Sequence, residues 1–368
     1  MFIIIPVGLD HHLRRGLPYA TFALALILIG IFLLTRSPIE ASQEAQAERA
    51  SNIIEHWQAF PWVHVPDDVA KLIMEDHAVQ RERQLRWTAE YDEDPTSAAE
   101  KIQQPDSRLG AGGMAILNAE AMGLSNGVPK ILSDDEMGDV AKLAFWQLLR
   151  DTSRQWREDT EHQLVGLLDD FKSARLADPT YRYGYIPDKP TARGLFAHMF
   201  LHAGWLHLIM NILFFYLAAV ALEDVWSAAT LVGVYVACGV AGALVWGASS
   251  SAGAIPMVGA SGAVAGLMGA FLVRLRQTNI RFVWSVFLVR WKSFNAPASL
   301  MLPLWIIAEL MSAMFFSDMS NVAYWAHIGG FCAGVSIALV FKATQFEVVI
   351  LGRDPDELAD ENPDEFRP

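Results

Sequence analysis

The stretch "AIPMVGASGAVAGLMGAFLV", residues 254–273, decides the fold because it is apolar enough to lie in a membrane and still contains a serine, Ser261. Apolar runs of about 17 to 25 residues are typical of transmembrane helices, since the backbone polar groups of a segment in lipid must be satisfied within it. A side chain that forms hydrogen bonds is costly in such a helix. Ser261, with small residues around it, is therefore a candidate functional residue.

The composition indicates a membrane protein. Of the 368 residues, 53% are hydrophobic, and the mean hydropathy is +0.25, which is too apolar for an ordinary soluble protein. The net charge of −13 argues against a nucleic-acid partner, because phosphate binding needs a clustered basic face. The two cysteines, Cys238 and Cys332, provide neither a disulfide framework nor a CxxC metal site.

Six apolar runs predict six transmembrane helices, over residues 17–35, 203–222, 228–247, 257–273, 298–316 and 322–341. The basic residues between the fourth and fifth runs, which have no acidic neighbours, place that connection in the cytoplasm by the positive-inside rule. Counting helices from there, we expect both termini in the cytoplasm. The second, fourth and sixth helices then all begin at the outer face of the membrane.

The chain divides into four predicted parts. Residues 1–35 form a cytoplasmic N-terminus with the first transmembrane helix, and 196–342 form a catalytic core with the other five. Between them, 36–195 is too long for a loop and is expected to be an extracytoplasmic, periplasmic domain. Residues 343–368, rich in acids, are expected to be a disordered cytoplasmic tail. The predicted fold class is an all-α membrane protein: a six-helix bundle with a large, mostly helical insertion between helices 1 and 2.

Two helices are expected inside the insertion. The residues "SDDE" at 133–136 match a capping box, with Ser133 as the N-cap. The helix that follows should bury apolar positions at helical spacing, and a break is possible near 152–160. An earlier helix is expected over 67–90. The apolar positions of the later helix include Leu164, Leu167, Leu168 and Phe171.

The polar side chains inside or at the entrance of the apolar runs form a short set, and each is a candidate site residue: His198, His202, His207, Asn211, Ser261, Glu309 and His327. Ser261 and His327 lie at nearly the same depth, about 6 Å of helix rise from the outer ends of their helices. A serine and an imidazole are the minimal nucleophile and general base. His207 and Asn211, four residues apart, share a helix face and could donate hydrogen bonds to an oxyanion.

Small residues in the fourth and sixth predicted helices allow these two helices to approach closely. Gly262 and Gly266 can pack against the GxxxG pair formed by Gly330 and Gly334.

A zinc pair formed by His198 and His202 is conceivable, but no HExxH motif is present, so we expect no metal and no cofactor. For Glu309, a protonated and hydrogen-bonded carboxyl is favoured, and a third catalytic residue or a proton relay stays open.

Three motifs resemble those of one family. They are "HMFLHAGWLHLIMN" at 198–211, "GASGA" at 259–263 and "AHIGGFCAG" at 326–334. Together they are similar to the rhomboid intramembrane serine proteases of the bacterial six-helix type, and the resemblance covers the six apolar runs, about half of the chain. It implies Ser261 as nucleophile, His327 as base, and Asn211 and His207 with the Ser261 N–H as oxyanion hole.

The resemblance also implies supporting roles for six residues: His202, Glu223, Gly259, Gly262, Gly330 and Gly334. Among them, Glu223 resembles a carboxylate that ties the inner end of the second helix to its neighbours. Some members stack a tyrosine on the base, four residues after the nucleophile. Here that position is Ala265, so the sequence does not indicate what orients the ring of His327.

The expected function is that of an intramembrane serine endopeptidase that cleaves transmembrane segments of membrane proteins near the outer face. Its expected partners are transmembrane substrates and the lipid bilayer, without nucleic acid or metal, and its expected location is a bacterial inner membrane. The sequence indicates no oligomeric state. Two alternatives remain: a rhomboid-like protein that binds client helices without cleaving them, and a channel or transporter, for which inverted repeats would be expected.

Overall fold

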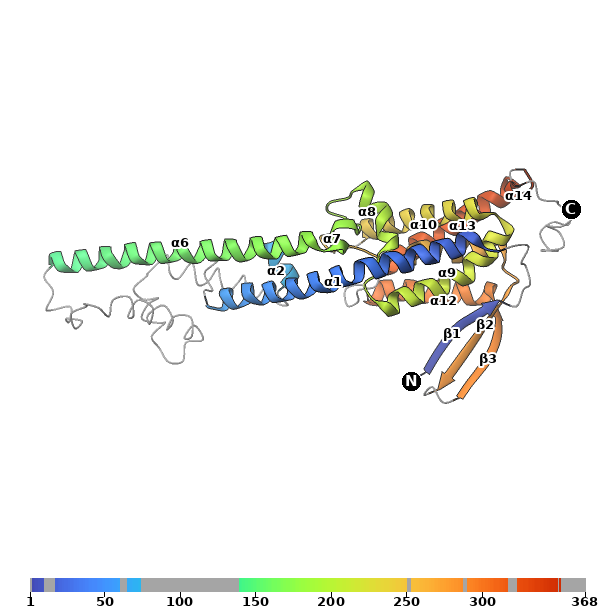
Figure 1. Ribbon diagram of the computed structural model, residues 1–368, viewed down its shortest axis with the longest axis horizontal. Helices are drawn as coiled ribbons and strands as arrows, with labels where there is room; N and C mark the ends of the chain where they lie inside the picture. Colours follow the sequence, from blue (N-terminus) through green and yellow to red (C-terminus); the bar gives the residue numbers. More distant parts are fainter. Residues whose placement is uncertain are drawn as a thin grey trace. The chain divides into compact units, whose positions relative to one another are not determined.

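The computed structural model describes residues 2–9, 17–59, 65–73, 139–249, 253–286, 290–316, 323–349 and 351. The chain forms two compact units. The first contains Met1–Ala41 and Ala177–Pro368, and the second contains Ser42–Leu176. Each unit is described by itself, with the labels of Figure 1.

The first unit is a bundle of helices with a small sheet at its edge (Figure 1). Its long helices include the start of α1, which continues into the second unit, and its short ones flank the bundle. The helices are α1 (Tyr19–Ala59), α7 (Pro179–Tyr183), α8 (Ala192–Ala197), the 3-10 helix η1 (His198–Phe200), α9 (Trp205–Val225), α10 (Ala228–Ser249), α11 (Ser261–Arg274), α12 (Ala298–Phe316), α13 (Tyr324–Ala343) and α14 (Phe346–Val349).

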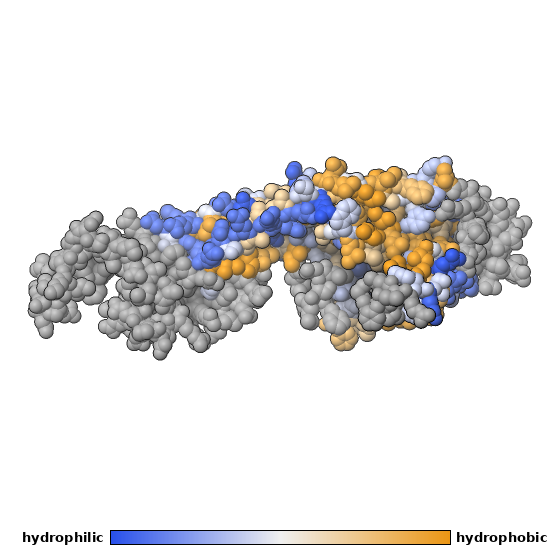
Figure 2. All heavy atoms as spheres, turned by 60° about the horizontal axis from the view of Figure 1, so that its bottom comes forward, coloured by the Kyte–Doolittle hydropathy of each residue, from blue (hydrophilic) through white to orange (hydrophobic). Residues whose placement is uncertain are grey.

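Within the described ranges, five helices are long and apolar enough to cross a membrane, namely α1, α9, α10, α12 and α13. Helix α11 is apolar but has only 14 residues. Together these six helices occupy the six predicted runs, which confirms the all-α membrane bundle. Large apolar side chains on their outer faces remain exposed, and Figure 2 shows the orange surface that they form over the bundle. This surface suits contact with lipid, so the protein is an integral, multi-pass membrane protein.

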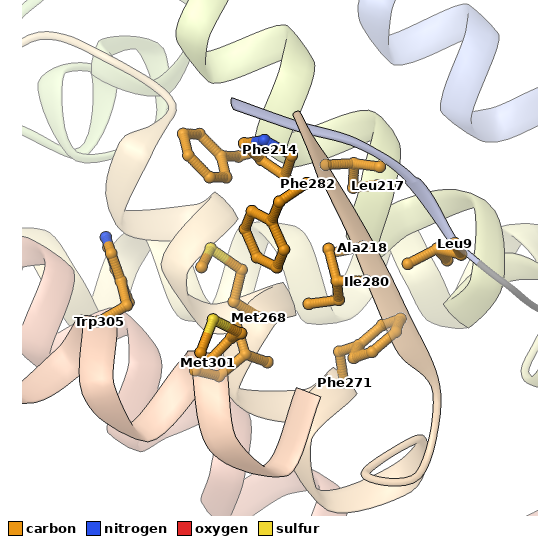
Figure 3. A pocket seen from close by; sticks show the side chains of 12 residues that line it. Leu9, Phe214, Leu217, Ala218, Met268, Phe271, Ile280, Phe282, Met301 and Trp305 are labelled. Atoms are coloured by element: carbon orange, nitrogen blue, oxygen red, sulfur yellow. The ribbon is translucent and has the colours of Figure 1, made fainter. Parts of the chain in front are cut away.

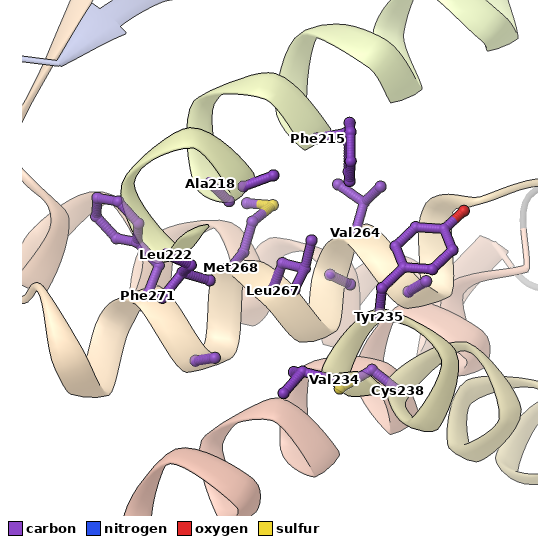
Figure 4. Packing of buried hydrophobic residues seen from close by; sticks show 14 of the residues in the cluster. Phe215, Ala218, Leu222, Val234, Tyr235, Cys238, Val264, Leu267, Met268 and Phe271 are labelled. Carbon is purple, nitrogen blue, oxygen red and sulfur yellow. The ribbon is translucent and has the colours of Figure 1, made fainter. Parts of the chain in front are cut away.

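Helix α11 lies at the centre of the bundle, with all its residues from Gly262 to Phe271 buried. Figure 4 shows side chains of α9 and α10, such as Phe215 and Tyr235, pointing toward α11. Tyr235, Phe215 and Leu267 are each completely buried. A helix surrounded by protein in this way does not need the length of one that faces lipid.

A three-stranded antiparallel sheet, which the sequence analysis did not predict, joins the N-terminus to the basic connection before α12. Its strands, in the order β1-β2-β3, are β1 (Phe2–Leu9), β2 (Asn279–Val286) and β3 (Arg290–Pro297). Phe282 and Phe294 face each other across β2 and β3 with stacked rings 5.2 Å apart. The alternation of Ile280, Phe282 and Trp284 with smaller or more polar residues in β2 is the period-two signal of a strand.

The second unit is helical, as predicted, and is built from the far half of α1 with α2 (Asp67–Ile73) and α6 (Asp139–Ala177). Helix α6 is continuous through 152–160, so the possible break there is wrong. The capping box at 133–136, and the rest of the predicted helix beyond Ile73, lie outside the described residues. The buried core of this unit contains three predicted apolar positions together with residues of α1 and α2: Leu164, Leu168, Phe171, Ile53, Val65, Val69 and Ala70.

The predicted disordered tail begins with ordered structure. Glu347, in α14, is buried and forms a bidentate ion pair with Arg274 at the end of α11, with N–O distances of 2.6 and 2.9 Å. Trp226 also donates its indole N–H to Glu347 at 2.8 Å. A buried arginine needs a carboxylate partner, which explains why the chain stays ordered here. Residues 352–368 lie outside the described part of the chain.

Candidate active site

Ser261 opens α11 two residues after a glycine with a left-handed backbone. Gly259 has a φ of +129°, a conformation that residues with a side chain rarely adopt. Its N–H donates to the carbonyl of His198 at 2.9 Å, which ties the approach of α11 to the segment before α9. Ser261, with intermediate exposure, therefore sits in the first turn of an otherwise buried helix.

The ring of His207, from α9, lies against this glycine. A Cβ atom on Gly259 would stand 2.8 Å from His207 Nε2 and 3.8 Å from Ser261 Oγ. The side chains of His207 and Ser261 therefore both lie near the position that a side chain of residue 259 would occupy. Any side chain at position 259 would push the imidazole of His207 away. His207 is also close enough to His327 for the two rings to repel each other if both are protonated.

Helices α11 and α13 approach each other backbone to backbone. A Cβ atom on Gly330 would overlap the carbonyl oxygen of Gly262, and one on Gly334 would overlap the carbonyl oxygen of Gly266. Ordinary carbon contacts need about 3.5 to 4.0 Å, so only glycine permits this separation. The predicted pairing of small residues is what the structure contains.

This approach brings the start of α11 next to the start of α13. A Cβ atom on Gly262 would lie 3.3 Å from the carbonyl oxygen of Ala326. Gly262 follows Ser261, and Ala326 precedes His327, so the two predicted catalytic residues stand on adjacent turns at the same end of their helices. Helix α10 closes on the same point, because a Cβ atom on Gly242 would lie 2.6 Å from the Ala326 oxygen.

Asn211 and His202 lie around His207. The buried Asn211 side chain donates from Nδ2 to the His207 carbonyl at 2.8 Å, within α9. The rings of His202 and His207 form an edge-on pair with centroids 5.1 Å apart. Burial, together with the nearby His207, lowers the pKa of His202 to about 3, so this ring is neutral at ordinary pH.

His198 is also buried, and its Nδ1 lies 3.1 Å from the carbonyl oxygen of Gly194. Burial lowers its pKa to about 4, which keeps the ring neutral. Within the described ranges, no three His, Cys, Asp or Glu side chains come together as metal ligands. The absence of a metal stays a prediction.

Residues 189–344 match the family model described as "Rhomboid domain", a range that contains η1 and α9 to α13. This part of the chain is similar to a rhomboid domain. Rhomboid domains define a family of intramembrane proteases, and the bacterial six-helix type named above stays a prediction for this chain.

Two curated proteins of Arabidopsis thaliana are similar to the chain. RHOMBOID-like protein 5 is 34% identical over 146 residues, which cover 40% of this chain and 43% of that protein. RHOMBOID-like protein 1 is 32% identical over 147 residues, covering 40% of this chain and 34% of that protein. The chain thus spans less than half of the length of these relatives, and the activity of the whole protein is a matter for proposal.

Glu223 ties two helices of the first unit together. Its carboxylate accepts hydrogen bonds from the backbone N–H groups of Ala20 and Thr21, each at 2.8 Å, and from the Thr21 hydroxyl at 2.7 Å. The first N–H groups of a helix have no partner within the helix, and a carboxylate there also suits the helix dipole. Glu223, at the end of α9, therefore caps the start of α1.

His327 has two neighbours on α12 that the sequence analysis did not assign to it. Its Nδ1 lies 2.6 Å from Oε2 of Glu309, and its ring centroid lies 6.1 Å from that of Trp305, with planes 32° apart. Trp305 and Glu309 are four residues apart and so share one helix face. This spacing was the available signal, but nothing in it indicates which helix that face meets.

An apolar pocket of about 240 Å³ lies next to this face of α12 (Figure 3). Trp305 belongs to its lining, so the same residue borders both the pocket and the ring of His327. Helices α9, α11 and α12 and the sheet supply the rest: Pro6, Leu9, Phe214, Leu217, Ala218, Met268, Phe271, Ile280, Phe282, Met301 and Leu302.

Proposed function

We propose that this rhomboid domain is an active intramembrane serine endopeptidase, with Ser261 as nucleophile and His327 as general base. The observation that carries the proposal is the contact between Gly262 and Ala326. Gly262 follows Ser261 and Ala326 precedes His327, so this contact supports a site that contains both residues. A serine hydroxyl is unreactive until a base takes its proton, and an imidazole at the same depth supplies that base.

The oxyanion hole of the proposed site consists of His207, Asn211 and the N–H of Ser261. His207 supports this role by its position over Gly259, on the Ser261 side of α9. Asn211 uses one Nδ2 proton for the His207 carbonyl, and its second proton is left for an oxyanion. His202 and the glycines at 259, 262, 330 and 334 support the site by position and close packing. Donors aimed at the developing negative charge are a large part of the catalytic effect in acyl transfer.

The substrate in this proposal is a transmembrane segment of another membrane protein, cut near the outer face. Such a segment must unwind locally, because a helix hides its carbonyl groups in hydrogen bonds. Helix-breaking and small residues near the cut should therefore favour cleavage.

The proposed location is a bacterial inner membrane, with both termini in the cytoplasm and residues 36–195 outside it. The basic residues before α12 support this orientation through the positive-inside rule. With it, the first turns of α11 and α13, and hence the proposed site, lie near the extracytoplasmic face.

The test is cleavage of a single-pass reporter protein by the purified chain in liposomes. We expect cleavage by the wild type and none above background with Ser261→Ala. Labelling of Ser261 by a fluorophosphonate should be lost in His327→Ala, because the base is gone. Undiminished cleavage by Ser261→Ala would refute the protease proposal, and inhibition by EDTA would revive a zinc site. Capture of the reporter without cleavage by the wild type would favour the client-binding alternative.

A further inference from the structure

Glu309 lies against the proposed general base. Oε2 of Glu309 and Nδ1 of His327 are 2.6 Å apart, which is short for a hydrogen bond of this kind and typical of one with charge on a partner. The two side chains keep only 17% and 12% of their exposure. The pair joins the middle of α12 to the first turn of α13. Glu309 contacts Nδ1 of His327 and not the other ring nitrogen, Nε2.

The position of the proton follows from the chemistry of the pair. A carboxylate can only accept a hydrogen bond, so Nδ1 of His327 must carry the proton when Glu309 is ionised. Nε2 then has a free lone pair. This is the tautomer that a general base needs in order to take a proton from a serine hydroxyl.

Helix α12 also holds the ring from its face. Trp305, one turn before Glu309, lies 6.1 Å from the His327 ring at 32°, a tilted arrangement. Position 265, in α11, is an alanine with 1% exposure, and its methyl group offers no ring to stack on His327. The carboxylate at the Nδ1 edge of the imidazole and the indole beside the ring therefore both come from α12.

We propose that Glu309 is a positioning residue for the base, so that Ser261, His327 and Glu309 act as a serine–histidine–glutamate triad. This inference rests on the proposed function. As Ser261 Oγ forms a bond to the scissile carbonyl carbon, its proton moves to His327 Nε2, and the ionised Glu309 stabilises the imidazolium without taking its proton. The proton then passes to the departing amine nitrogen as the C–N bond breaks. Water hydrolyses the acyl-enzyme with the same base.

The opposite protonation is the competing arrangement. A protonated Glu309 would donate to Nδ1, the proton of a neutral His327 would then be on Nε2, and the ring would be unable to accept from Ser261. In that case Glu309 would hold His327 in an inactive tautomer, and its replacement would raise activity instead of lowering it.

The first experiment compares three variants of the full-length protein in liposomes with the reporter substrate. Glu309→Gln keeps the shape and removes the charge, Glu309→Asp keeps the charge, and Met311→Leu, as a control, changes an exposed, lipid-facing side chain of α12 without adding a polar group. We expect Glu309→Gln to lower kcat by about 10-fold to 100-fold, which is no more than the lower end of the contribution of general acid–base catalysis, because Glu309 acts only through His327, with KM nearly unchanged. Glu309→Asp should recover part of that loss, and Met311→Leu should match the wild type.

The second measurement reports the tautomer and does not depend on turnover. In protein labelled with ¹⁵N-histidine, the His327 signals, identified by their loss in His327→Asn, should show a protonated Nδ1 in the wild type and a changed pattern in Glu309→Gln. A protonated Nε2 with a bare Nδ1 in the wild type would overturn the proposal. Should Glu309→Gln fold poorly, as judged by its melting temperature, Glu309→Asp and this spectrum decide alone.

Failure of the triad is distinguishable from failure of the protease proposal. If Ser261→Ala abolishes cleavage while Glu309→Gln retains the full kcat, the site is a serine–histidine dyad and Glu309 has no part in positioning the base. If Ser261→Ala cleaves normally, the protease proposal itself fails, whatever Glu309 does.

Discussion

Replacement of Gly330 by alanine tests how the helix approach creates the site. The added Cβ would overlap the carbonyl oxygen of Gly262 and stand 2.8 Å from its carbonyl carbon. Since carbon atoms normally approach to about 3.5 Å, α11 and α13 must separate locally by about 1 Å. A misplacement of about 1 Å of catalytic groups can cost about 100-fold in rate. We therefore expect the cleavage rate of Gly330→Ala to fall by about 100-fold.

The same change should lower stability, but by less than the clash suggests. Overpacking typically costs about 1 to 3 kcal/mol, and alanine gains up to about 1 kcal/mol over glycine in helix propensity. Gly233→Ala, in α10, separates the two effects because no atom lies within 4 Å of its Cβ position. The control should melt at or above the wild-type temperature and cleave normally, whereas Gly330→Ala should melt below both.

The assay is initial cleavage rate in liposomes together with thermal unfolding in detergent. A wild-type rate for Gly330→Ala, in a protein that melts at the temperature of Gly233→Ala, would refute the reasoning, because the two helices would then tolerate separation. Loss of rate in both variants would point to a general effect of alanine and not to the contact at Gly262.

Three further predictions address other contacts. Glu223→Gln should lower stability by about 1 to 2 kcal/mol, since it removes a charged cap from the start of α1, and an unchanged melting temperature would contradict this. The pKa values of His198 and His202, held at about 4 and about 3, lie below that of an unfolded histidine, so the unfolded state binds more protons and stability should fall as pH drops below about 6.5. Melting temperatures at pH 7 and 5 check this, and His202→Phe should show a smaller difference. Gly259→Ala should abolish fluorophosphonate labelling, because it strains the backbone and displaces His207; normal labelling would show that this ring is not needed there.

Much of the bundle was predictable because membrane insertion depends on local composition. The free energy of placing an apolar run in lipid depends on the residues of that run, so the six helices could be located in the sequence without knowledge of their neighbours. Ser261 and His327 could be selected as candidates for a related reason, since polar groups in such runs are rare and their depths follow from the predicted helix direction. The spacing of Gly330 and Gly334 likewise predicts a close contact between helices.

Other features depend on partners that are distant in the sequence. Glu309 was visible as an acid in an apolar run, but the favoured prediction for it was a protonated carboxyl with no assigned partner. Only the packing of α12 against α13 turns it toward His327, 18 residues later. The ion pair of Arg274 with Glu347 orders a segment that its composition described as a disordered tail.

The sequence by itself determined the membrane bundle, the order of its helices, and the residue types that a serine protease would need, because these follow from hydropathy and spacing along one chain. Only the tertiary structure decided which helix faces meet. The rotation of α12 that sets Glu309 and Trp305 against His327, where Ala265 leaves the ring unsupported, is a result of side-chain packing between helices and leaves no periodic mark in any one of them.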